Sequence, residues 1–322
     1  MSATGLEAVL DRRLAALRTA HPELESAISL QELLIRTALA AARPPQAPSF
    51  PLPRERALHT VRQGVPLLHD QPLDLDVHFA ADLFSRLVNA LQQQQQQQPD
   101  QQLGPALEAI VEAATTARLD PQQLFAEAFV QHAEHVAELA RQAGLDDDGA
   151  EVLGTLAHQA VMPILRAYAE HLRPLLERLD DGTLEGAAWQ RGYCPICGGW
   201  PLLGELRGVE LAEFLRCSGC GSGWRWRRLV CPYCGNDDYQ SLRSLQIEGE
   251  QRFRVSVCER CTGYLKVGNA FDPPPAALLA LDDLASLHLD VAAIERGYQR
   301  PSGTGFPIEL AVADQEWVEE LA

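Results

Sequence analysis

The eight cysteines of this 322-residue chain fall into four Cys-x-x-Cys pairs, all between residues 194 and 261. The pairs are Cys194 and Cys197, Cys217 and Cys220, Cys231 and Cys234, and Cys258 and Cys261. Such a pair turns both sulfurs toward one ion, and two pairs complete a tetrahedral site. The sequence therefore predicts two tetrathiolate metal sites, around which this stretch must fold.

Two pairings of the four motifs are compatible with their spacing. The loops between successive pairs contain 19, 10 and 23 residues. Sequential pairing joins the first pair to the second and the third to the fourth, whereas a cross-braced fold joins the first to the third and the second to the fourth. We favour sequential pairing, because each half then forms a complete ribbon of two knuckles joined by a β-hairpin.

The available ligand atoms limit which metal ions the two sites can bind. There is no histidine between His171 and His288, so all-sulfur ligation is expected at both sites. Tetrahedral sulfur suits zinc or a single rubredoxin-like iron and disfavours magnesium, calcium and manganese. Four thiolates leave no position at which water could be activated, so a structural role for both ions is favoured.

Composition and charge narrow the class of protein. The net charge is −17, which argues against general affinity for nucleic acid or anionic membranes. The N-terminus lacks a basic segment followed by an apolar run, so no export signal and a cytoplasmic location are predicted. Cytoplasmic thiols stay reduced, so the cysteine pairs indicate metal ligands rather than disulfides.

The predicted fold class is α plus small β. We expect a helical bundle over residues 1–185, a first four-cysteine ribbon over 186–228 and a second over 229–272. A C-terminal helix and tail follow over 273–322, with the helix at about residues 276–296 after a proline linker.

Several local patterns refine the helical half. Asp120-Pro121 predicts a helix start, and we expect one helix from there to about Gly144. The proline-rich segment 44–72 is expected to be irregular, and the glutamine run 92–98 is expected to form a loop.

Two weaker signals favour ordinary structural roles. His132 and His135 flank Glu134, but the spacing required for a di-iron bundle is missing, so His132 is interpreted as a core residue. The Trp224-Arg-Trp-Arg-Arg228 segment could bind single strands, yet tryptophans that shield the metal sites and arginines that offset thiolate charge explain it better.

The cysteine region and the segment after it contain a characteristic order of short motifs: Tyr193-Cys-Pro-Ile-Cys-Gly198, Leu215-Arg-Cys-Ser218, Trp224, Cys231-Pro-Tyr-Cys-Gly235, Tyr264-Leu-Lys266 and Asp282-Asp-Leu-Ala-Ser-Leu287. In this order of motifs the chain resembles the formate dehydrogenase accessory protein family, FdhE. The resemblance implies a cytoplasmic maturation factor that contacts the catalytic subunit of a respiratory formate dehydrogenase before export. It also implies rubredoxin-like iron at the four cysteine pairs, with zinc as the alternative.

The sequence thus predicts an assembly chaperone rather than an enzyme. Its expected partner is the formate dehydrogenase catalytic subunit, without membrane insertion, with nucleic acid disfavoured and with self-association left open. Two other functions stay open: a rubredoxin-like iron protein for redox or oxygen sensing, and a nucleic-acid-binding zinc ribbon.

Overall fold

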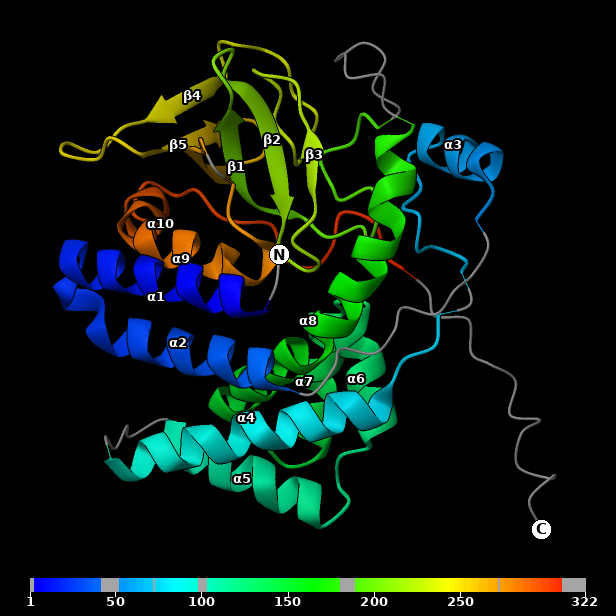
Figure 1. Ribbon diagram of the computed structural model, residues 1–322, viewed down its shortest axis with the longest axis vertical. Helices are drawn as coiled ribbons and strands as arrows, with labels where there is room; N and C mark the ends of the chain where they lie inside the picture. Colours follow the sequence, from blue (N-terminus) through cyan, green and yellow to red (C-terminus); the bar gives the residue numbers. More distant parts are fainter. Residues whose placement is uncertain are drawn as a thin grey trace.

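The computed structural model describes residues 3–41, 52–71, 73–97, 103–179, 189–271 and 273–308. A helical half carries a six-stranded sheet at one end (Figure 1). The C-terminal helices lie between that sheet and the first two helices of the chain. The predicted class, a helical region followed by a small sheet and C-terminal helices, is confirmed.

The helical half is arranged around its longest helix, α8 (Asp147–Glu177), which contacts α2 to α7. Its inward face is apolar along the whole length, from Leu153 through Ile164 to Leu172. The other helices are α1 (Ala3–Ala20), α2 (Glu25–Ala40), α3 (Arg54–Arg62), α4 (Val77–Gln97), α5 (Leu103–Thr115), α6 (Pro121–Phe129) and α7 (Ala133–Gln142). A short 3-10 turn, Pro22–Leu24, joins α1 to α2.

The helix predicted from Asp120 to Gly144 starts and ends where expected but is broken in the middle. The Asp120 side chain accepts a hydrogen bond from the amide of Gln122, and Gly144 has a φ of 85°. Between α6 and α7, however, Gln131 has a φ of 62°, which a helix cannot contain. The single-helix prediction is therefore wrong, because a tertiary contact of Gln131, described below, overrides the helical periodicity.

Three further predictions are corrected by the structure. The segment 44–72 contains α3, because residues 54–62 are free of proline; residues 42–51 and 72 lie outside the described residues. The glutamine run is helical to Gln97, since α4 buries its apolar face and glutamine extends a formed helix readily; Gln98 lies outside the described residues.

The predicted final helix is also divided. It consists of a 3-10 turn (Ala276–Leu278), α9 (Leu279–Ala285) and α10 (Leu287–Ile294). At the break, the Ser286 hydroxyl donates to the carbonyl of Asp282 at 2.8 Å, and such side-chain bonds compete with the helical ladder.

The sheet joins the two predicted ribbons edge to edge. Its strands are β1 (Pro201–Arg207), β2 (Ala212–Cys217), β3 (Gly223–Arg225), β4 (Leu242–Leu245), β5 (Phe253–Cys258) and β6 (Tyr264–Asn269). Their order is β3-β2-β1-β6-β5-β4, antiparallel throughout except where β1 pairs in parallel with β6. The β-hairpin expected within the second ribbon lies between β4 and β5, and Gly249 in the connecting segment has a φ of 90°. The division into four domains stays a prediction. One sheet spans the predicted ribbon domains 186–228 and 229–272.

The C-terminal helices tie the sheet to the N-terminus. Helix α9 contributes Leu281 to an apolar cluster with Leu14 of α1 and Ile28 of α2. Helix α10 packs Leu289 against the β5 residue Val255. Among the described helices, none combines the length and the apolarity that a bilayer crossing requires.

Lys266, the only lysine of the chain, is fully buried under these helices. Its ammonium lies 2.5 Å from a carboxylate oxygen of Asp290 and 2.8 Å from one of Asp283. Arg300 bridges the same two carboxylates at 2.7 Å each. Burial opposes ionisation of Asp290, but Arg300 and Lys266 hold its pKa below the usual value. This network joins two of the segments on which the family resemblance rests.

Lys266→Ala is expected to lower the free energy of unfolding by about 3 kcal/mol, because it leaves the buried carboxylate of Asp290 with one partner fewer. The control is Arg243→Ala, which removes the exposed ion pair with Glu259 and should cost less than about 1 kcal/mol. Denaturant unfolding followed by tryptophan fluorescence measures both. Equal costs for the two variants would contradict the assigned role of Lys266.

Candidate metal centres

The four cysteine pairs form four knuckles with the same backbone geometry. In each, the amide of the first cysteine donates to the carbonyl five residues later, at 2.8 to 2.9 Å. The donor and acceptor residues are Cys194 and Gly199, Cys217 and Ser222, Cys231 and Asn236, and Cys258 and Gly263. A repeated local turn thus presents both sulfurs of every pair on one side.

The residue after the second cysteine is left-handed in all four knuckles. Gly198, Gly221 and Gly235 have φ values of 74°, 72° and 69°, which glycine adopts without steric cost. The fourth knuckle places Thr262 there, at a φ of 55°. A left-handed residue with a Cβ costs about 1 to 2 kcal/mol, so the fourth knuckle is held by its surroundings rather than by local preference.

The sulfurs converge in two groups of four, and within each group all lie within 4.8 Å of one another. Sequential pairing is therefore confirmed: the first group holds Cys194, Cys197, Cys217 and Cys220, and the second holds Cys231, Cys234, Cys258 and Cys261. We call these groups the first and the second cluster.

The spacing of the sulfurs fits a tetrahedral ion. In the first cluster, Cys194 Sγ lies 3.6 Å from Cys220 Sγ, and Cys197 Sγ lies 3.3 Å from Cys217 Sγ. In the second cluster, the corresponding distances are 3.7 Å and 3.8 Å. Metal–sulfur bonds of about 2.3 Å place tetrahedral sulfurs about 3.8 Å apart, whereas a disulfide needs about 2.05 Å. Both clusters can hold a metal ion.

The first cluster is buried where the helical half meets the sheet. All four of its cysteines are buried, and they belong to the same apolar core as α8. The carbonyls of Pro195 and Ile196 accept hydrogen bonds from Leu67 and Leu68, at 2.8 and 3.0 Å. Burial raises the pKa of Cys194 well above its usual value, so a bound cation is what would stabilise four adjacent thiolates there.

Gln131, at the break between α6 and α7, reaches the first cluster. Its amide nitrogen lies 3.7 Å from Cys197 Sγ, and its side chain occupies the space beside Gly199 and Gly219. A Cβ at either glycine would come within 2.8 Å of the Gln131 amide oxygen. This contact explains why the helix is interrupted at that position.

The second cluster lies nearer to solvent. Cys234 is exposed and Cys261 is half-buried, while Cys231 and Cys258 are buried. Asn236 donates to Cys258 Sγ at 3.5 Å. Although burial opposes it, hydrogen bonds from the amides of Cys261 and Arg260 lower the pKa of Cys258 to about 7. The two clusters thus share a ligand set but differ in access.

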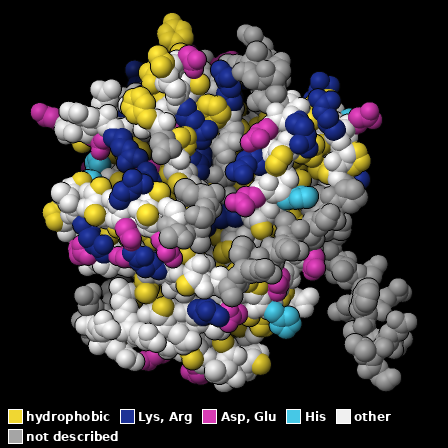
Figure 2. Space-filling view, in the orientation of Figure 1, with side chains coloured by type: hydrophobic (Ala, Val, Ile, Leu, Met, Phe, Trp, Pro, Cys, Tyr) yellow, Lys and Arg dark blue, Asp and Glu magenta, His cyan; other side chains and the backbone are white. Residues whose placement is uncertain are grey.

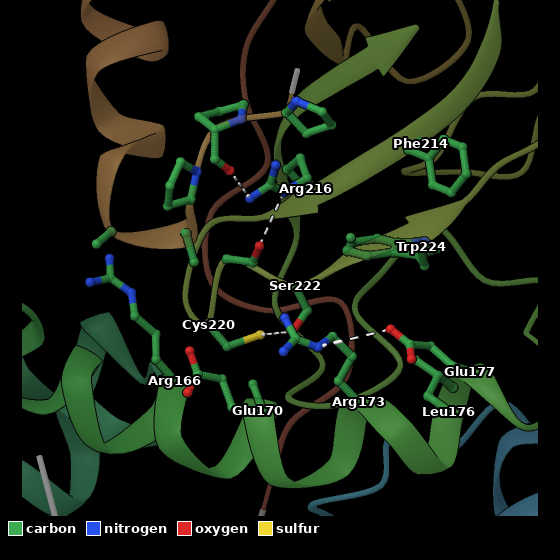
Figure 3. Close-up of a pocket in the computed structure, with 18 of the residues that line it drawn as sticks. Arg166, Glu170, Arg173, Leu176, Glu177, Phe214, Arg216, Cys220, Ser222 and Trp224 are labelled. Atoms are coloured by element: carbon green, nitrogen blue, oxygen red, sulfur yellow. Dashed lines mark hydrogen bonds and ion pairs between the residues drawn. The ribbon is translucent and has the colours of Figure 1, made fainter. Parts of the chain in front are cut away.

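A cleft of about 700 Å³ opens beside the first cluster, between α8 and the first ribbon. Side chains of α8 face those of β2, β3 and the second knuckle across it (Figure 3). Five arginines and only two glutamates line it, in a chain that is strongly acidic as a whole: Arg166, Arg173, Arg207, Arg216, Arg225, Glu170 and Glu177. The cleft is therefore a local basic site.

The arginines of the cleft differ in how well they are paired. Arg207 and Arg216 share the carboxylate of Glu205, at 2.6 and 2.7 Å. Arg173 has a loose ion pair with Glu177 at 3.9 Å. Within the described ranges, the Nε atom of Arg166 is buried without a hydrogen-bond partner. Burial lowers the pKa of Arg166 to about 10, against the attraction of Cys220.

The Trp-Arg segment is mostly structural. Trp224 and Trp226 are both buried, and their indole nitrogens donate to the carbonyls of Arg191 and Val230. Base stacking needs exposed aromatic faces, which these two rings do not offer. The preference for a shielding role over contact with nucleic acid agrees with this burial.

The interpretation of His132 as a core residue is wrong. Its side chain is 32% exposed and lies 3.0 Å from Glu127, which also contacts His135. Sequence spacing did not indicate Glu127 as a partner of His132, because the two side chains meet only when the helix is broken at Gln131.

Comparison with known proteins supports the resemblance found in the sequence. The profile of the family described as "FdhE, C-terminal domain" matches residues 229–306. The chain is 32% identical over 132 residues to an FdhE homologue of Aquifex aeolicus, and 37% identical over 132 residues to one of Pseudomonas aeruginosa. These matches cover 40% and 38% of this chain. They cover 46% and 42% of the relatives, so the chain spans less than half the length of each.

The similarity in fold extends further than the similarity in sequence. The crystal structure of the FdhE protein from Pseudomonas aeruginosa matches with a TM-score of 0.57 and 26% identity, covering 97% of both chains. The helical half, without sharp motifs of its own, therefore belongs to the same overall architecture.

The difference in access predicts the order of metal loss. In the presence of a chelator, the second cluster should release its ion at least about tenfold faster than the first. The chelator can approach the exposed Cys234 directly, whereas access to the first cluster requires the helical half and the sheet to separate locally. Metal content followed over time measures both phases. Cys234→Ser should abolish the fast phase and Cys197→Ser the slow one; release of both ions at one rate would contradict the prediction.

Proposed function

Because this chain carries the C-terminal domain of the FdhE family and shares the fold of a solved FdhE protein, we propose that it is a cytoplasmic accessory protein for formate dehydrogenase. It acts as an assembly chaperone that binds the immature catalytic subunit before export. The observation that carries the proposal is the pairing of this family match with two clusters whose four cysteines fill a tetrahedral site.

The chemistry of the clusters supports a binding role rather than catalysis. Four thiolates leave an ion without a position for water or substrate. The eight cysteines are the proposed ligands, and each ion would contribute on the order of 10 kcal/mol to folding. The first cluster would then fix the angle between the helical half and the sheet, and with it the shape of the cleft between them.

The cleft beside the first cluster is the proposed contact surface for the partner. It has a volume of about 700 Å³, and its arginines outnumber its acidic groups. On the face in Figure 2, basic side chains gather mainly over the sheet and the upper part of the molecule. We infer that the cleft takes an acidic segment of the catalytic subunit, whose carboxylates would pair with Arg166 and Arg173.

The ions are proposed to be iron, on the strength of the family resemblance, with zinc as the alternative. Both metals accept tetrahedral sulfur, so the cysteine geometry suits either one.

A second candidate function, electron transfer or oxygen sensing by a rubredoxin-like iron, is favoured by the exposure of Cys234, which gives the second cluster a contact with solvent.

Protein purified without oxygen should contain two iron atoms per chain and show visible thiolate-to-iron absorption that bleaches on reduction. Elemental analysis and the visible spectrum measure this together. Colourless protein with two zinc ions would contradict the iron assignment and end the redox candidate, while leaving the accessory role intact.

The tagged full chain is expected to co-purify with the formate dehydrogenase catalytic subunit, and deletion of its gene should abolish formate oxidation. Replacing both Arg166 and Arg173 by glutamine should weaken recovery of the subunit at least about tenfold, the loss expected for two charge-assisted contacts. The control is Arg86→Gln on α4, whose arginine pairs with Asp82 away from the cleft lining.

Two outcomes separate the parts of this proposal. Recovery of the subunit by the double variant at the level of the unaltered chain would reject the cleft as the contact surface. No recovery by the unaltered chain, together with unchanged formate oxidation in the deletion strain, would reject the accessory role itself.

A further inference from the structure

We propose that Glu127, His132 and His135 form a third metal site, which binds an exchangeable divalent transition ion at the surface next to the first cluster. The three residues lie at the junction of α6 and α7 and are separate from both groups of cysteines. This inference does not depend on the proposed accessory function.

The geometry of the three side chains suits an ion. One carboxylate oxygen of Glu127 lies 3.0 Å from Nδ1 of His132 and 3.0 Å from Nδ1 of His135. All three ligand atoms lie within 4.8 Å of one another. Bonds of about 2.0 to 2.2 Å to zinc place neighbouring ligands about 3.3 Å apart, so small side-chain movements would replace the hydrogen bonds with metal bonds.

The break in the helix creates this arrangement. In a continuous helix, residues five apart point about 140° away from each other, so His132 could not meet Glu127. The left-handed Gln131 turns the chain, and His132 becomes the N-cap residue of α7. A strained residue of this kind persists only where its surroundings hold it. Here the strained backbone places the side chain of Gln131 against Cys197 and that of His132 in the histidine site.

The donor set and its exposure define the ligand. Two imidazoles and a carboxylate suit zinc, iron, nickel or copper rather than calcium or magnesium. Three protein ligands leave at least one position open, unlike the cysteine clusters. His135 is 65% exposed, so an ion can arrive from solvent, and His132 also lines a cavity of about 570 Å³. The site is therefore suited to an ion that exchanges.

Gln131 connects this site to the first cluster. Gln131, which directly precedes His132, donates a hydrogen bond to Cys197 Sγ. An ion bound to His132 would therefore also hold Gln131 in place. Occupancy of the third site would then restrain the buried first cluster from outside, without adding a ligand to it.

The test is calorimetric titration of Zn²⁺ into the full chain after both cysteine clusters have been loaded. One additional ion per chain is expected, and Glu127→Gln and His135→Ala should each weaken its binding at least about tenfold. The matched control is His78→Ala, an exposed histidine of α4, which should leave the affinity unchanged. Elemental analysis confirms that every variant retains the two cysteine-bound ions.

A second pair of variants isolates the backbone. Gln131→Gly keeps the left-handed conformation and should retain the third ion, whereas Gln131→Val disfavours that conformation and should weaken its binding at least about tenfold. Both variants lose the contact with Cys197, so the difference between them reports the turn alone. Absence of a third ion in the unaltered chain, or equal binding by His135→Ala, would overturn the proposal.

Discussion

The contact on which the architecture depends is the first cysteine cluster, buried between the helical half and the sheet. Its knuckle accepts backbone hydrogen bonds from Leu67 and Leu68, and its sulfurs share a core with α8. Four thiolates buried in one place are costly unless a cation compensates their charge. This site and the C-terminal helices together hold the sheet against the bundle, and the arginine-lined cleft opens beside it.

The second cluster repeats the fold of the first in a different setting. Both have the same knuckle hydrogen bonds and the same order of pairs and strands, yet only the second contains an exposed cysteine, Cys234. The parallel pairing of β1 with β6 places the two ribbons side by side in one sheet. One ligand set thus serves two environments, a closed site that joins the halves and an accessible site that faces solvent.

Two left-handed residues and a buried arginine lie beside the cysteine clusters. Gln131 and Thr262 hold left-handed conformations beside the first and second cluster, and Arg166 is close enough to Cys220 for their charges to interact. Each of these features costs free energy locally. They are retained together because the sulfur sites and the buried Lys266 network hold the surrounding chain in place.

Features that are complete within a few neighbouring residues could be predicted from the sequence. The Cys-x-x-Cys spacing gave the knuckles and two four-sulfur sites, and Asp120-Pro121 gave the start of α6, because a cap or a tight turn is complete within a few residues. Four features became visible only in the folded chain: the break at Gln131, the contact of Glu127 with His132, the burial of Lys266 and the difference in exposure between the clusters. Each of these depends on contacts between segments far apart in the chain, which periodicity and local propensity do not encode.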